Sequence, residues 1–304
     1  MCKIISIANQ KGGVGKTTTA MNLGVALELQ GKHTLLIDFD PQASLSSYLG
    51  FINDNGDNID ELPTINNLMM SAIGLERKSE DIMSYIRHSE VNNIDYIPSD
   101  LNLANADCYL SGVISRETVL KRMLTKELIG NYDYIIIDCL PSLGVLLMNA
   151  LVASDGFIIP VQTQKFAFDG LVMLENVFGQ IKNTVNNKLE LIGVLATMYE
   201  TNATASKVVL EKLKQRYPDK LFDTYIHKAT EAEKSTNKQK SLCLYNNRPG
   251  EEYKAVAKEV IEVFWTFDIQ KDVNEDSELK IILYYSDNRV IAYLTNKFKE
   301  PFLF

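Results

Sequence analysis

Gln10-Lys-Gly-Gly-Val-Gly-Lys-Thr17 is the stretch that decides the fold. It follows a short apolar run over residues 3–8, which is typical of a buried strand, and it precedes a helical pattern that ends near Gln30. Glycines at such a junction let backbone N–H groups curl around phosphate oxygens, and the helix N-terminus adds partial positive charge. The stretch therefore predicts a phosphate-binding loop between the first strand and the first helix.

This loop carries the groups that bind a nucleoside triphosphate. We expect Lys16 to reach the β and γ phosphates and the Thr17 hydroxyl to ligate Mg²⁺. Gln10 stands where the usual pattern has glycine, so the loop is a variant. Lys11 is a second cation that can neutralise transition-state charge, unless it is a solvated loop lysine. ATP and Mg²⁺ are the expected ligands, and the predicted binding residues are Gly12, Gly13, Val14, Gly15, Lys16, Thr17 and Thr18.

Short apolar strands alternate with helical patterns along the rest of the chain. The sequence predicts strands over residues 34–38, 94–98, 134–138, 156–160 and 189–197, and helices over 116–128, 168–181, 206–216 and 251–264. This order predicts an α/β fold with a mostly parallel, twisted sheet that helices cover on both faces. Ligands of such sheets bind at the carboxyl ends of the strands.

The sequence changes character after Phe267. Residues 268–278 are acidic and are predicted to form a linker, and residues 279–285 and 290–294 are predicted to pair as a β-hairpin. We therefore expect two domains, a phosphate-binding domain over residues 1–267 and a small β-prone extension over residues 268–304.

The composition is typical of a globular protein without disulfides. The chain has 304 residues, of which 46% are hydrophobic and 23% charged, and its net charge of −8 argues against a surface that coats nucleic acid everywhere. Four cysteines without a C-x-x-C pair indicate a reducing cytoplasm, and three scattered histidines predict no zinc site. Polar residues interrupt the N-terminal apolar run, and no apolar run reaches eighteen residues, so we expect neither a signal segment nor a membrane span.

Three carboxylates follow predicted strands. Asp38 and Asp40 lie two residues apart at the end of one strand, so their side chains leave in related directions, and Asp138 ends another. Asp38 and Asp138 are better placed to hold Mg²⁺ through waters, since Mg²⁺ keeps part of its hydration shell. The alternative for Asp38 and Asp40 is that they cap the next turn.

The motif Asn9-Gln-Lys-Gly-Gly-Val-Gly-Lys-Thr-Thr-Thr19 resembles the deviant Walker A motif of the ParA/Soj family of partition ATPases. Residues 38–42 and 133–144 are similar to the family's second motif and its Walker B region, and weaker matches run to about residue 264. The related MinD and nitrogenase iron proteins usually have glycine before the first lysine, so the Asn-Gln form favours ParA. Leu140 departs from the family, which commonly has proline there.

The resemblance implies a cycle. Two monomers sandwich two ATP molecules, the lysine matching Lys11 crosses to the partner's nucleotide, and the residue matching Asp40 activates the attacking water. The ATP-bound homodimer binds nonspecific duplex DNA, and a ParB-type centromere-binding protein stimulates slow hydrolysis. A cytoplasmic, nucleoid-associated protein without a membrane partner is expected. The alternatives are a MinD-like membrane-cycling regulator and an ATP-binding cargo scaffold with negligible turnover.

The expected DNA surface departs from the family. Family members often carry arginines after the strand at 189–197 and after the next strand, where this chain has Asn202 and Glu231. Residues 207–240 nevertheless hold nine basic and five acidic groups. Phosphate contacts from lysines would give sequence-independent affinity, unless these are solvated helix faces. His227 can contact the base, touch DNA or belong to an ordinary loop, and the predicted DNA contacts are Lys228, Lys234, Lys238 and Lys240.

Overall fold

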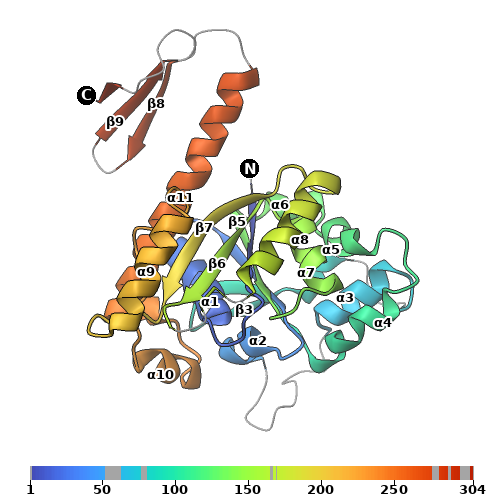
Figure 1. The fold of residues 1–304 in the computed structure, drawn as a ribbon. Helices are drawn as coiled ribbons and strands as arrows, with labels where there is room; N and C mark the ends of the chain where they lie inside the picture. Colours follow the sequence, from blue (N-terminus) through green and yellow to red (C-terminus); the bar gives the residue numbers. More distant parts are fainter. Residues whose placement is uncertain are drawn as a thin grey trace. The chain divides into compact units, whose positions relative to one another are not determined.

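The computed structural model describes residues 2–51, 63–76, 81–164, 167–168, 170–275, 281–286, 289–294 and 302–303, with side chains up to residue 264. The chain divides into two compact units, residues 1–258 and 259–304. Figure 1 shows the order of the elements.

A seven-stranded sheet forms the centre of the first unit, in the order β3-β4-β2-β5-β1-β6-β7. All neighbours pair in parallel except β3 with β4. This arrangement confirms the predicted α/β fold with a mostly parallel sheet. The strands are β1 (Lys3–Ile7), β2 (Thr34–Phe39), β3 (Arg87–Ser89), β4 (Ile94–Ile97), β5 (Tyr134–Cys139), β6 (Gly156–Gln162) and β7 (Glu190–Thr197).

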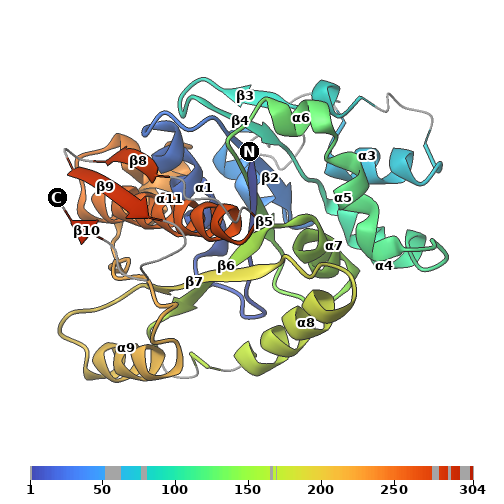
Figure 2. The same cartoon turned by 90° about the horizontal axis from the view of Figure 1, so that it is seen from above.

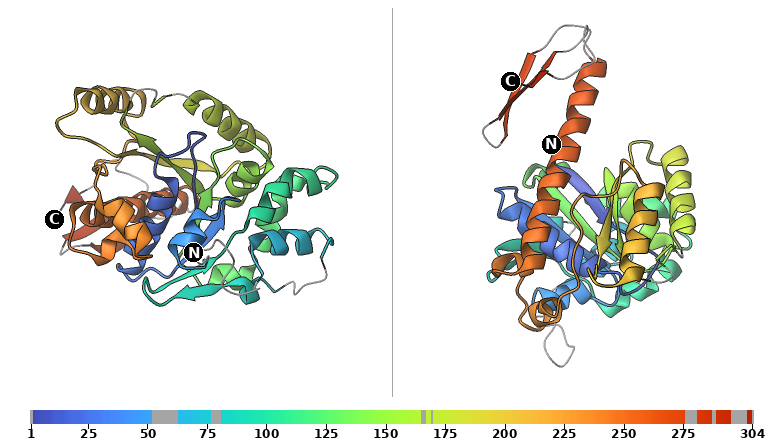
Figure 3. Two further views of the ribbon diagram at one scale, coloured as in Figure 1. Left: turned by 90° about the horizontal axis from the view of Figure 1, so that it is seen from below. Right: turned by 60° about the vertical axis from the view of Figure 1, so that its left-hand side comes forward.

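Helices cover both faces of this sheet, which explains why every residue of β2 and β5 is buried. Helix α1 (Lys16–Glu28) packs against β2 and β5, and α7 (Val145–Ala153) packs against β1 and β5. The two helices lie on opposite sides of the strands in Figure 2, and Figure 3 shows the same layers from the other end. Because β1 leads directly into α1, the phosphate loop lies at the carboxyl edge of the central strands.

The other α-helices of the described chain are α2 (Ser44–Tyr48), α3 (Ile65–Ala72), α4 (Ala106–Tyr109), α5 (Val119–Met123), α6 (Lys126–Gly130), α8 (Leu171–Thr184), α9 (Thr204–Arg216), α10 (Glu231–Asn237) and α11 (Arg248–Glu275). Short 3-10 turns lie at Ile82–Tyr85, Leu101–Asn105, Arg116–Thr118 and Leu242–Leu244. None of the described helices is long and apolar enough to cross a membrane.

Residues 116–128 form three short elements rather than the single predicted helix. A 3-10 turn and α5 end before Leu124, whose backbone leaves the helical region. The Thr125 hydroxyl then accepts a hydrogen bond from the Leu128 N–H and caps a new helix, α6. The cap thus explains why the helical pattern breaks here.

The C-terminal region also differs from expectation. Residues 268–275 continue helix α11, where the sequence predicts a linker. The acidic residues do not stop the helix because no glycine or proline follows Gly250 before Glu275, and the intervening residues tolerate helical backbone. Beyond it, β8 (Ile281–Ser286) and β9 (Arg289–Leu294) pair antiparallel at the place of the predicted hairpin, and β10 (Phe302–Leu303) adds to β9.

Candidate active site

The phosphate loop has the backbone that its glycines predict. Gly13 and Gly15 have φ angles of 71° and 89°, a left-handed conformation that side chains with a Cβ rarely adopt. Gly15 is the residue that precedes helix α1, so the first free N–H groups of this helix face the loop. Together, the loop and the helix N-terminus form a site for phosphate oxygens.

Asn9 anchors the start of this loop. Its Nδ2 donates to the carbonyl of Pro160 on β6 at 2.7 Å, and its Oδ1 accepts from the Lys11 N–H at 2.9 Å. On the other side of the loop, the Thr197 hydroxyl at the end of β7 donates to the Val14 carbonyl at 2.8 Å. Sequence spacing does not reveal that Asn9 anchors the loop, because its partner Pro160 lies 151 residues away.

Lys16 is the buried cation of the site. Its Nζ donates to the Lys11 carbonyl at 3.1 Å, so the loop curves around its own lysine. Burial lowers the pKa of Lys16, while the nearby carboxylates of Asp138 and Asp40 act in the opposite direction. Lys16 therefore lies close enough to interact both with the two carboxylates and with the phosphates of a bound nucleotide.

Asp138 and Asp38 lie next to one another at the ends of β5 and β2, where they are register partners. Burial and the negative charge of Asp38 raise the pKa of Asp138 well above its usual value, and the Thr17 hydroxyl and Lys16 act against this shift. Both Asp138 oxygens are buried, and neither makes a hydrogen bond of good geometry with any described residue. A buried carboxylate without a well-formed hydrogen bond is suited to bind a cation.

Asp38, which the sequence predicts to hold Mg²⁺ together with Asp138, has three hydrogen-bond donors instead. One oxygen accepts from the Ser46 N–H and hydroxyl at 2.8 and 2.7 Å, and the other accepts from the Asp40 N–H at 3.2 Å. Ser46 belongs to the first turn of α2, so Asp38 caps this short helix. Burial raises the pKa of Asp38 to about 6.

The donor set fits a magnesium ion that also binds phosphate. Two unpartnered oxygens of Asp138 face the region of the Thr17 hydroxyl, and Mg²⁺ prefers one or two such protein ligands beside phosphate oxygens and water. No group of three His, Cys, Asp or Glu side chains in the described chain is arranged to hold a metal by itself. The site therefore suits Mg²⁺ that arrives with a nucleotide.

Asp40 lies beside these groups at the end of β2. Its side chain is buried, with 9% of the residue exposed, and its Oδ1 accepts from the Gln42 N–H at 2.9 Å. Its charge acts on both Lys16 and Asp138. The structure thus brings together all the residues that the sequence predicts around the phosphates.

A small pocket adjoins the phosphate loop on the side of β7. Its volume is about 120 Å³, and its lining is mostly apolar. Gly15 and Thr18 connect it to the loop, so it lies where the base of a bound nucleotide can sit. The other residues that contribute to the wall include Met198, His227, Ala229, Leu242, Pro249 and Tyr253.

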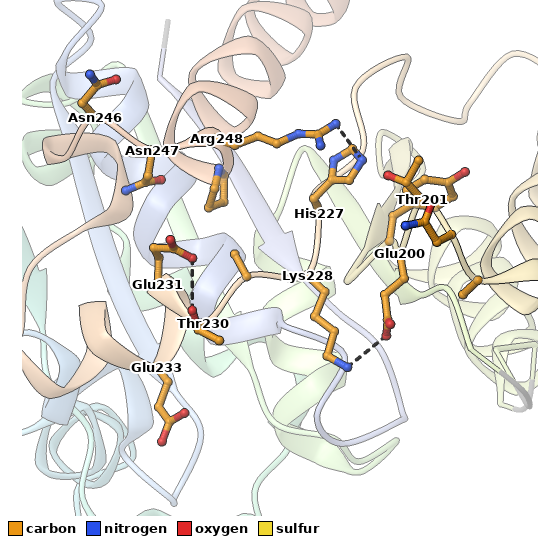
Figure 4. A pocket seen from close by; sticks show the side chains of 15 residues that line it. Glu200, Thr201, His227, Lys228, Thr230, Glu231, Glu233, Asn246, Asn247 and Arg248 are labelled. Carbon is orange, nitrogen blue, oxygen red and sulfur yellow. Dashed lines mark hydrogen bonds and ion pairs between the residues drawn. The ribbon is translucent and has the colours of Figure 1, made fainter.

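A larger pocket of about 980 Å³ lies beyond His227, and one of the four lysines expected to bind DNA, Lys228, lines it (Figure 4). Lys228 is in this pocket, but its Nζ pairs with Glu200 at 2.9 Å. Residues 221–226 contribute no regular strand here, and only isolated bridges join Leu221 and His227 to β7 and Tyr199. Asn202 and Glu231 line the same pocket, so the two positions where relatives often have arginine meet in space.

The remaining predicted DNA contacts differ in their surroundings. Lys240 lies over the ring of Tyr245, 5.0 Å from the centroid. Lys234 and Lys238 are exposed, one on α10 and one directly after it, and they are four residues apart on the same side. Within the described chain, no ion pair engages either of these two lysines.

The mostly parallel sheet, the phosphate loop and the buried Asp138 carboxylate define the fold and site of a P-loop ATPase. A family model for the AAA domain matches residues 2–191. The chain is 40% identical over 262 residues to the sporulation initiation inhibitor protein Soj of Bacillus subtilis, which covers 86% of this chain and 98% of that protein. It belongs to the ParA/Soj family of partition ATPases.

Two solved structures support the comparison. A putative plasmid partition protein from Borrelia burgdorferi bound to AMPPNP is 31% identical, with a TM-score of 0.68 over 88% of this chain and 100% of that one. Cobyrinic acid a,c-diamide synthase from Mycobacterium smegmatis, with a bound ATP analogue and magnesium, is 30% identical, with a TM-score of 0.73 over 87% and 96%. The same fold thus holds a nucleotide analogue in both proteins and magnesium in the second.

Proposed function

We propose that this chain binds Mg²⁺-ATP at its phosphate loop, hydrolyses it slowly, and uses the cycle to move DNA in partition. The observation that carries the proposal is the Asp138 carboxylate, which lies buried and unpartnered beside Thr17 and Lys16. A protein that did not bind a cation here would be more stable with a neutral residue at this position.

Each residue of the site has a distinct role in this proposal. The N–H groups of the loop and the Lys16 ammonium bind the phosphates, and Thr17 and Asp138 hold Mg²⁺. Bound Mg²⁺ neutralises phosphate charge and orients the oxygens for in-line attack. Asp40 orients the attacking water, and Asp38 keeps Asp40 and α2 in place through the hydrogen bonds described above. Hydrolysis then depends mostly on positioning and charge stabilisation.

We also propose that the ATP-bound form is a homodimer to which Lys11 contributes in trans. The Lys11 backbone takes part in two loop hydrogen bonds, through its N–H and its carbonyl. No described residue forms an ion pair with its side chain. A fixed backbone with a half-exposed ammonium group suits a residue that reaches another molecule's phosphates.

For DNA we propose the exposed pair Lys234 and Lys238 rather than Lys228. The Glu200 carboxylate already neutralises Lys228, and phosphate binding there would require this ion pair to break. Lysines that face solvent bind phosphates without such a cost and give affinity that depends on salt rather than on sequence. A ParB-type centromere-binding protein is the proposed partner that stimulates hydrolysis.

A phosphate-release assay tests the proposed function. We expect slow release from ATP that requires Mg²⁺, is lost in Lys16→Ala, and rises when the partner and DNA are added. Nucleotide binding without release above the Lys16→Ala background would favour the cargo scaffold. Sedimentation with anionic liposomes instead of DNA would favour the membrane-cycling regulator.

A further inference from the structure

Glu252 forms several contacts with His227, which lines the small pocket beside the phosphate loop. One of its carboxylate oxygens accepts from the His227 backbone N–H at 2.8 Å. The other lies 2.6 Å from the His227 Nδ1 and accepts from the Arg248 Nε at 2.8 Å. Only 13% of the Glu252 side chain is exposed, so these contacts are largely shielded from water.

The contacts define the protonation state of His227. Its Nε2 lies 2.7 Å from the Arg248 Nη2, as Figure 4 shows. Arginine offers only donors, so Nε2 must accept and the proton must be on Nδ1, where it is donated to Glu252. His227 is thus neutral, in one tautomer, and held at both ring nitrogens.

Backbone hydrogen bonds also hold this segment, one of them from the Ile226 N–H to the Ala196 carbonyl of β7 at 2.8 Å. The backbone of residues 226–228 is bound to Tyr199 by two hydrogen bonds, of 2.9 and 3.1 Å, in an isolated bridge instead of a strand. The His227 ring also packs against Tyr199 and Tyr225, each with its centroid 5.2 Å away. Glu252 binds both the backbone and the ring of His227, so it fixes how the His227 side chain borders the pocket.

We propose that Glu252 is a positioning residue for the nucleotide base. It acts through His227 and residues 226–229, which form one wall of the pocket beside Gly15 and Thr18. The inference rests on the proposed function, because it requires a nucleotide whose phosphates lie in the loop. Glu252 touches neither the phosphate loop nor the carboxylates, so its effect is confined to the base end of the ligand.

Calorimetric titration with two ligands tests this role. Mg²⁺-ADP carries the base, whereas Mg²⁺-pyrophosphate carries only the phosphates, and neither is consumed. We expect Glu252→Ala to weaken ADP binding about tenfold, as for the loss of one charge-assisted hydrogen bond, and to leave pyrophosphate binding within about twofold. Glu251→Ala is the matched control, because Glu251 lies on the same turn but is exposed and pairs with Lys254.

Further variants separate positioning from folding. Glu252→Gln keeps the shape of the side chain and is used if Glu252→Ala is poorly folded. It should also weaken ADP binding and leave pyrophosphate binding unchanged. In a His227→Ala background, Glu252→Ala should weaken ADP binding less than twofold, because the His227 side chain through which Glu252 acts on the base is already absent. Equal loss of both ligands, or ADP affinity equal to that of Glu251→Ala, would overturn the inference. A parent protein that binds neither ligand would instead refute the proposed function.

Discussion

Asp38 and Asp138 are register partners at the ends of neighbouring parallel strands, yet one carboxylate has three hydrogen-bond donors and the other has none of good geometry. The difference arises from α2, whose first turn brings the Ser46 N–H and hydroxyl to Asp38. Asp138 instead lies beside the Thr17 hydroxyl and the Lys16 ammonium group, both from the first turn of α1. The pair therefore separates into a structural carboxylate and one that is available to a cation.

Asp138→Asn should make the ligand-free protein more stable and abolish its response to Mg²⁺-ATP. The pKa of Asp138 is raised, so its ionised form at neutral pH costs folding free energy that an amide avoids. We expect a gain of about 1–3 kcal/mol, measured by urea unfolding without ligand. Thermal shifts with and without Mg²⁺-ATP measure the second effect.

Asp133→Asn is the control for this change. Asp133 lies just before β5, at the opposite end of the sheet, where it accepts a hydrogen bond from the His33 N–H at 2.9 Å. This variant should keep the parent's ligand response. If the ligand-free Asp138→Asn protein were less stable than the parent, the Asp138 carboxylate would make stabilising hydrogen bonds or ion pairs in the ligand-free protein.

Asp40→Ala should retain ATP binding and ATP-induced dimerisation while losing hydrolysis. Asp40 lies beside Lys16 and Asp138, but within the described chain its carboxylate accepts a hydrogen bond only from the Gln42 N–H. Its removal should therefore leave the phosphate loop intact. Single-turnover phosphate release measures hydrolysis, and a rate equal to that of the parent would exclude the water-activating role.

Lys11→Ala should keep nucleotide affinity within about threefold and lose the ATP-dependent dimer. The backbone contacts of Lys11 to Asn9 and Lys16 remain in the variant, so the loop should keep its shape. Light scattering with AMPPNP measures the dimer, and Lys32→Ala is a control at a lysine outside the site. A Lys11→Ala dimer as tight as the parent's would remove the proposed trans contact.

Cys108 should be the one thiol of the native protein that reacts rapidly with a disulfide reagent. Burial raises the pKa values of Cys2, Cys139 and Cys243 to about 12, so at pH 8 these remain protonated, whereas Cys108 is exposed. The thiolate is the nucleophile, so protonated, buried thiols react slowly. We expect one rapid equivalent in the native state, four after denaturation, and no rapid phase in Cys108→Ser. If two thiols of the parent reacted rapidly, at least one of Cys2, Cys139 and Cys243 would be accessible to the reagent, which contradicts their burial.

The phosphate loop could be predicted from the sequence because its determinants are local. Glycines, lysines and a threonine lie within eight consecutive positions between a strand and a helix. Helix α7, in contrast, gave no clear signal, because its residues are buried on nearly every side and show no amphipathic period. The break at Leu124 also depends on a cap that the pattern of apolar residues does not reveal.

Contacts between distant residues account for what could not be predicted at the site. The Glu200–Lys228 ion pair and the Glu252–His227 contacts join segments that lie 28 and 25 residues apart and that sequence spacing leaves unrelated. The predicted group of four DNA-binding lysines illustrates the consequence. Charge counting treats them as equivalent, whereas the structure engages Lys228 and Lys240 with neighbouring side chains.

The last prediction concerns DNA and follows from this difference. The double variant Lys234→Glu and Lys238→Glu should bind random duplex DNA at least about tenfold more weakly than the parent at 50 mM salt with ATP, because phosphate contacts dominate such affinity. Its salt dependence between about 50 and 200 mM should be shallower, since fewer counterions are released. Lys228→Glu should have a smaller effect, because Glu200 already neutralises this lysine.

Filter binding with ATP, across a salt series, measures these three affinities. Lys32→Glu reverses the charge of a half-buried lysine outside this surface and controls for the change in net charge. Dimerisation should be checked by light scattering, so that weaker DNA binding is not a consequence of a lost dimer. If the double variant binds like the parent while Lys228→Glu does not, the larger pocket is the DNA surface and the Glu200 ion pair opens on binding. If none of the variants differs from the parent, the lysines after β7 are solvated helix faces and DNA binds elsewhere.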